Sequence, residues 1–113
     1  MPRMPNLPNL AQAERDEVLD TLKQRYGGTL PEATLRQLAA GDFKAASGAV
    51  ERQAKEAEES DDLKRCLQLA QTALDGALKA AEALTNPVAK AIAIAGAYAV
   101  FILAQISCYD DHG

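Results

Sequence analysis

Aromatic residues are scarce in this chain, which contains no tryptophan, two phenylalanines and three tyrosines. Hydrophobic residues nevertheless make up 48% of its 113 residues. The core must therefore be built from Ala, Leu, Ile and Val. This composition is typical of closely packed helices, because strands favour aromatic and β-branched side chains. The length allows a single domain with one core.

The sequence also has a single histidine and none of the common short catalytic motifs. His112, the single histidine, stands next to the C-terminal residue, where no rigid element is expected to hold it as a general base. The sequence has no GxGxxG, GxxxxGK(S/T), CxxC or HExxH motif. The paired carboxylates Glu58-Glu59 and Asp61-Asp62 fall at a helix junction, where capping and solvation explain them. We expect no enzymatic activity and no cofactor.

A metal site is not expected. Cys108, Asp110, Asp111 and His112 carry ligating atoms, but all lie within five consecutive residues. Structural zinc sites draw their ligands from two separated pairs. We interpret residues 110–113 as a polar tail.

Basic residues are scattered, and the net charge is −4. No basic face is therefore expected for nucleic acid. Residues 1–8 hold three of the five prolines and no apolar run, so they predict a flexible arm and not a cleavable signal peptide. We expect a cytoplasmic protein. The alternatives are membrane association and secretion by another route.

Residues 9–59 predict three helices. Asn9 is a suitable N-cap for the first helix, which ends at Gly27-Gly28. Thr29 and Glu32 have the spacing of a capping box for the second. The third begins after Asp42 and continues through Val50 and Ala54 into a charged stretch, residues 55–59.

Residues 61–107 predict an antiparallel helical hairpin. Ser60 is the N-cap of its first helix, and Asn86-Pro87 ends that helix and starts the next. Apolar residues recur at alternating spacings of four and three in both helices, which indicates two matched packing seams. The seam residues are Leu63, Leu67, Ala70, Leu74, Ala77, Ala81, Leu84, Val88, Ile92, Ala95, Ala99, Ile102 and Ile106. The sequence thus predicts an all-α fold: a small helical bundle of four to five helices in one domain, residues 9–109.

The last helix carries 19 residues without charge, from Ala91 to Tyr109. This approaches the length of a membrane-spanning helix, and Ala89, Ala93 and Ala97 form a row of small residues. An apolar helix wrapped by the others in a bundle explains the same pattern, and its alanine content favours this interpretation. A third alternative is a soluble bundle that opens and inserts the hairpin.

The two cysteines lie at equal distances from the predicted turn. If the hairpin turns at Asn86-Pro87, Cys66 and Cys108 meet at its open end and can form a disulfide. The alternative is two buried thiols in a reducing cytoplasm.

Gly27-Gly28 follows an acidic amphipathic helix and so resembles the double-glycine leader of secreted bacterial peptides. The resemblance implies that residues 1–28 are a leader and that the remainder is cargo. Arg25 and Glu17 stand where such leaders carry apolar residues, and a Gly-Gly turn after a helix is the interpretation we prefer.

Two functions fit these features. The first is a non-catalytic interaction or assembly protein, whose seams pack against a second copy of itself or another protein. The second is a membrane-active protein of the bacteriocin, toxin or holin type, which inserts residues 88–107 into lipid. We favour the first, because the seams are matched.

Overall fold

The computed structural model describes residues 10–48, 50 and 60–112, and their regular structure is entirely helical. The predicted all-α fold with a C-terminal hairpin is confirmed. The helices are α1 (Gln12–Tyr26), α2 (Glu32–Ala39), α3 (Phe43–Ala46), α5 (Asp61–Glu82) and α6 (Pro87–His112). The expected arm 1–8 and the charged stretch 55–59 lie outside the described residues. The predicted Asn9 cap is wrong, because α1 begins at Gln12 with Ala11 in the N-cap position.

Three helices begin at the polar residues that the sequence indicates. The Ser60 Oγ accepts a hydrogen bond from the Leu63 N–H at 3.1 Å. The Asn86 Oδ1 accepts one from the Ala89 N–H at 3.1 Å. Asp42 caps α3 in the same way. These bonds satisfy N–H groups that have no partner within the helix, so the caps fix where α3, α5 and α6 start.

The predicted capping box of α2 is wrong. The Thr29 hydroxyl donates to the Tyr26 carbonyl oxygen at 3.1 Å, and Pro31 takes the N-cap position without a side-chain bond. The Glu32 carboxylate pairs with Lys23 of α1 instead, at 2.7 Å. The helix begins two residues later than the predicted box requires, so Thr29 is not its N-cap.

Two helix ends differ from the predicted ones. Helix α3 ends at Ala46, and the predicted third helix is interrupted at Ser47; Gly48 and Val50 are again helical, and Ala54 lies outside the described residues. Helix α6 runs on to His112, so Cys108 and the expected polar tail belong to its last turns. Cys108 is only 2% exposed, and its burial holds these turns in place.

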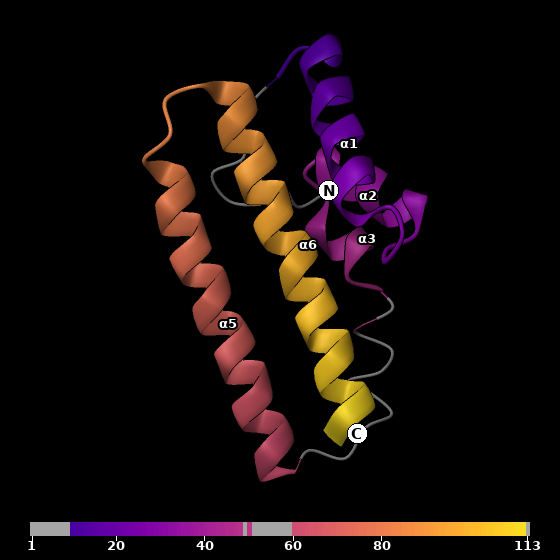
Figure 1. Cartoon of the computed structure of the whole chain (residues 1–113), viewed down its shortest axis with the longest axis vertical. Coiled ribbons are helices and arrows are strands. Elements are labelled where there is room, and N and C mark those ends of the chain that lie inside the picture. Colours follow the sequence, from indigo (N-terminus) through magenta and orange to yellow (C-terminus); the bar gives the residue numbers. More distant parts are fainter. Residues whose placement is uncertain (1–9, 49, 51–59, 113) are drawn as a thin grey trace.

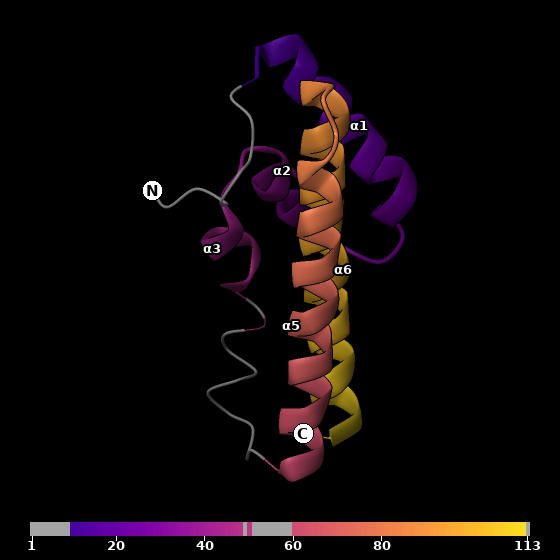
Figure 2. The same cartoon turned by 90° about the vertical axis from the view of Figure 1, so that its left-hand side faces the viewer.

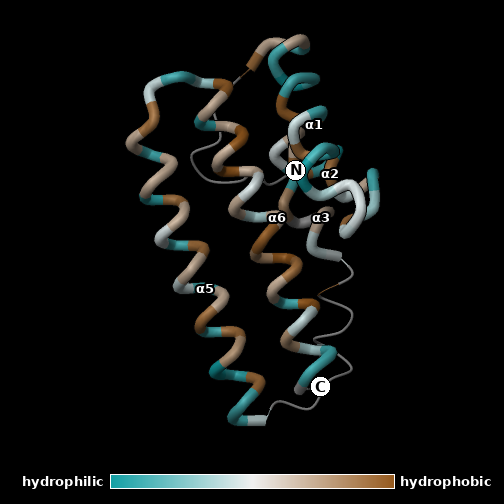
Figure 3. The backbone as a smooth tube through the Cα atoms, in the orientation of Figure 1, coloured by the Kyte–Doolittle hydropathy of each residue, from teal (hydrophilic) through white to brown (hydrophobic). Residues whose placement is uncertain are grey.

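Helix α6 is the central element of the fold. It packs against α5 along the hairpin and against α1 and α2 on its other sides (Figures 1 and 2). Figure 3 shows that most of α6 is hydrophobic, whereas hydrophobic and hydrophilic residues alternate along α5. The predicted packed-core role of this helix therefore agrees with its contacts, although part of its surface stays open.

The hairpin core follows the predicted seams with two exceptions. Leu63, Ala70, Leu74, Ala81, Ala95, Ala99 and Ile102 are buried, and Leu67, Val88, Ile92 and Ile106 are half-buried. Ala77 and Leu84 are exposed. A strict heptad drifts by about 20° per repeat around a straight helix. This drift carries Ala77 and Leu84 out of the seam and onto one side of the hairpin.

Candidate interaction groove

An apolar groove of about 490 Å³ runs along that side of the hairpin. We call it the hairpin groove. Helix α5 contributes Ala70, Ala73, Leu74, Ala77, Ala80 and Ala81 to its lining, and the connection after α5 contributes Leu84. Helix α6 contributes Ile92, Ala93, Gly96, Ala97, Val100, Phe101 and Ala104, and α1 contributes Arg25 and Tyr26.

Small side chains create the groove. Nine of the 16 lining residues are alanine or glycine, so the two helices approach each other without filling the space along their edge. The lining extends from residue 70 on α5 to residue 84 just after that helix, and from 92 to 104 on α6. At a rise of 1.5 Å per residue, these stretches are roughly 18–21 Å long.

The dimensions of the hairpin groove limit what can enter it. Its volume is about 490 Å³, whereas a helix about 10 Å across and roughly 20 Å long occupies about 1,600 Å³. A whole α-helix is about 10–12 Å across with its side chains, so it does not fit inside. One row of aliphatic side chains does fit, because non-bonded carbons approach to about 3.5–4 Å.

The C-terminal end of α1 supplies the polar groups of the groove. The Tyr26 hydroxyl lies against Gly96 of α6, where a Cβ atom would come within 3.4 Å of it. Arg25 precedes it and is exposed. Among the described residues, no hydrogen bond or ion pair involves the Arg25 side chain. Its guanidinium is thus available at the edge of an apolar surface.

The large exposed hydrophobic residues gather at this groove. Within the described part of the chain they are Leu69, Leu84 and Val100, which are 67%, 40% and 50% exposed. Leu84 and Val100 line the groove, and Leu69 stands one turn before the lining residue Ala73 on the same side of α5. Grouped apolar exposure of this kind is typical of interaction surfaces.

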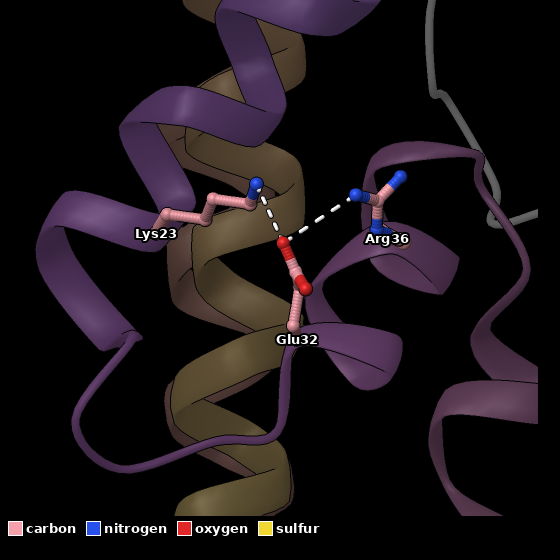
Figure 4. A network of polar contacts seen from close by, with 3 residues as sticks. All are labelled: Lys23, Glu32 and Arg36. Atoms are coloured by element: carbon pink, nitrogen blue, oxygen red, sulfur yellow. Dashed lines mark hydrogen bonds and ion pairs between the residues drawn. The ribbon is translucent and has the colours of Figure 1, made fainter.

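The position of α1 depends on its contacts with α2 and α6. Leu22 of α1 and Leu35 of α2 are fully buried in the shared core. Figure 4 shows the polar contact above this core, where Glu32 lies between Lys23 and Arg36 at 2.7 and 3.4 Å. The hydrogen bond and charge of Lys23, with the charge of Arg36, hold the pKa of the Glu32 carboxyl below its ordinary value.

The structure joins Cys66 and Cys108 in a disulfide, with their Cα atoms 5.8 Å apart. The bond links α5 to α6 at the open end of the hairpin, while the chain links them at the turn. The two helices that form the hairpin groove are therefore fastened to each other at both ends.

No cluster suited to a metal appears in the ranges that the structure describes: no three His, Cys, Asp or Glu side chains there could hold an ion. Cys108 takes part in the disulfide, and Asp110 and Asp111 are exposed at the end of α6. The His112 side chain lies outside the described part.

Sequence reasoning missed several residues of the hairpin groove. Leu69 and Val100 are apolar residues outside the seams, which is a signal that could have marked a second surface. Arg25 and Tyr26 carry no such signal, because only the packing of α1 on α6 brings them to the hairpin.

Helix α6 is the one described helix that is long and apolar enough to cross a membrane. This finding concerns length and composition only, and the core helix of a soluble protein passes the same test. In its most apolar window, 56% is buried within the protein.

Compared with known proteins, the chain matches no family model, no curated protein and no solved structure. Functional inference therefore rests on the hairpin groove and its surroundings.

Proposed function

We propose that this protein is a non-catalytic interaction protein that associates with a second copy of itself through the hairpin groove. The observation that carries the proposal is the grouping of Leu69, Leu84 and Val100 around one apolar groove. The buried seam residues are occupied within the hairpin, and the two exposed ones, Ala77 and Leu84, lie in the groove. We therefore assign the interaction to the groove instead of the seams.

The composition of the groove supports a binding role without chemistry. Fourteen of its 16 lining residues are apolar, and Arg25 and Tyr26 are the two exceptions. An apolar centre with a few polar groups at the edge is the usual composition of a protein interface. A row of side chains from a partner would fill it.

Size-exclusion chromatography with light scattering tests the proposal. We expect the protein to be a dimer or a larger assembly. The Val100→Glu variant should shift toward the monomer, because it places a charge in the apolar contact. Gln68→Glu is the matched control, since it adds the same charge at an exposed position outside the groove lining of α5. A monomeric wild-type protein, or equal behaviour of the two variants, would contradict the proposal.

We also propose that the protein works in an oxidising compartment. The Cys66–Cys108 disulfide supports this location, because such bonds persist outside reducing cytoplasm. Alkylation of freshly isolated protein, before and after reduction, tests it by mass. Thiols that react without prior reduction would contradict this location and favour the cytoplasm.

A second candidate function is membrane insertion of the bacteriocin, toxin or holin type. The length and hydropathy of α6 favour it. Insertion would require α6 to leave its contacts with α1 and α2. Release of dye from anionic vesicles by the wild-type protein, and its loss in Val100→Glu but not in Gln68→Glu, would favour this candidate over self-association.

A further inference from the structure

We infer that two copies pack antiparallel across a two-fold axis, so that the acidic open end of each hairpin lies against Arg25 of the other. This inference rests on the proposed self-association and adds its register and orientation. It follows from the distribution of charge on the face that carries the hairpin groove.

The acidic end of this face is formed by Asp62 and Asp111. Both are exposed. Asp62 lies seven residues before Leu69, and Asp111 lies seven residues after Ala104. Seven residues make almost two helical turns, so both carboxylates stand on the groove side of their helices. Asp62 lies in the first turn of α5 and Asp111 in the last turn of α6, so both lie at the open end of the hairpin.

The basic group of the same face is Arg25. Tyr26, the next residue, packs against Gly96, which is 15 residues from Asp111 along α6. That separation corresponds to roughly 22 Å. The face is therefore positive beside α1 and negative at the open end, with apolar residues between.

This charge pattern selects the orientation of the second copy. Parallel packing would bring acid to acid and base to base, which is unfavourable. Antiparallel packing about a two-fold axis brings each Arg25 to the partner's acidic end, and symmetry gives the contact twice. The same apolar side chains then supply both the groove and the row that fills it.

The placement of α1 agrees with this arrangement. Figures 1 and 2 show α1 beside the half of α6 nearest the hairpin turn. A second copy therefore approaches the groove along the half nearest the open end. In that position its α6 presents Val100, Ala104 and Ser107, a single row of small and medium side chains. The volume of the groove accommodates one such row.

Sedimentation equilibrium of charge variants at low salt tests the inference. Arg25→Glu should raise the dimer dissociation constant by about three- to tenfold, because two exposed ion pairs are lost. Lys79→Glu is the matched control: its charge change is similar, but by helical period it points away from the groove on α5. Circular dichroism checks that each variant keeps its helices.

The double variant Arg25→Glu, Asp111→Arg supplies the decisive comparison. It exchanges the charges of the proposed pair, so its dissociation constant should return toward the wild-type value. Higher salt should narrow the differences among the variants.

Each other outcome overturns the inference. If the dimer forms and Arg25→Glu behaves like Lys79→Glu, the antiparallel register is wrong while the proposed function stands. If the double variant regains nothing, the pairing with Asp111 is wrong. An open series of larger assemblies contradicts a two-fold interface. A protein that stays monomeric removes both the inference and the proposed function.

Discussion

The Tyr26 hydroxyl lies 3.4 Å from the position that a Cβ atom on Gly96 would take. Through this contact the end of α1 reaches α6 beside the hairpin groove. This is an ordinary van der Waals distance, so position 96 has room for a methyl group but not for a larger side chain.

Substitution of Gly96 should show this limit. We expect Gly96→Ala to change the free energy of unfolding by less than about 1 kcal/mol, because its gain in helix propensity offsets a small shift of the Tyr26 ring. Gly96→Leu should destabilise the protein by about 1–3 kcal/mol, since its larger side chain displaces Tyr26. Urea denaturation measures both. Equal stability of the two variants would show that Tyr26 does not restrict this position.

Ala95 and Ala77 should respond differently to the same enlargement. Ala95 is 0% exposed in the hairpin seam, so Ala95→Leu should destabilise the fold by about 1–3 kcal/mol through overpacking. Ala77 is exposed in the groove, so Ala77→Leu should leave unfolding almost unchanged and weaken self-association by filling the space. Urea denaturation and light scattering separate the two effects. A stability loss in Ala77→Leu like that in Ala95→Leu would place Ala77 in the seam.

Removal of the disulfide should lower stability without changing the helical architecture. The two cysteines are 42 residues apart, and the loop-closure entropy for that separation is about 4 kcal/mol. We expect the Cys66→Ser, Cys108→Ser double variant to lose up to about this amount in urea denaturation. Adding a reductant to the wild-type protein should reproduce the loss and should not affect the variant. A reductant that leaves the wild-type curve unmoved would contradict the role of the bond.

Glu32 should titrate below its ordinary pKa. Its neighbours Lys23 and Arg36 favour the carboxylate, first through the Lys23 hydrogen bond and then through charge. The stabilisation is therefore present above the ordinary pKa of a glutamate and is lost as the pH falls through the lowered one. Carboxyl chemical shifts followed against pH measure the value, which should rise in Lys23→Gln. Lys79→Gln, which has no contact with Glu32, should leave it unchanged.

The hairpin was predictable because its signals are local. Ser60 and Asn86-Pro87 define the helix starts through short-range hydrogen bonds, and the seam spacing indicates which sides face each other. The same spacing placed Cys66 and Cys108 at one end, where the structure joins them.

The remaining features depend on contacts between distant segments. Thr29 and Glu32 have the spacing of a capping box, but Lys23 of the preceding helix competes for the carboxylate. Seam spacing also cannot predict that Ala77 is exposed, because the heptad drift rotates this residue only slightly away from the buried side of α5. The hairpin groove appears only once Arg25 and Tyr26 are placed against α6.

The fastening of α5 to α6 at both ends makes them parts of one covalent ring. Residues 83–86, which join the two helices at the top of this ring, are all exposed to solvent. A protease that cuts there would produce two chains that stay linked by the disulfide and separate only when a reductant is added. The protein can thus be cut at this exposed connection and keep both walls of its groove together.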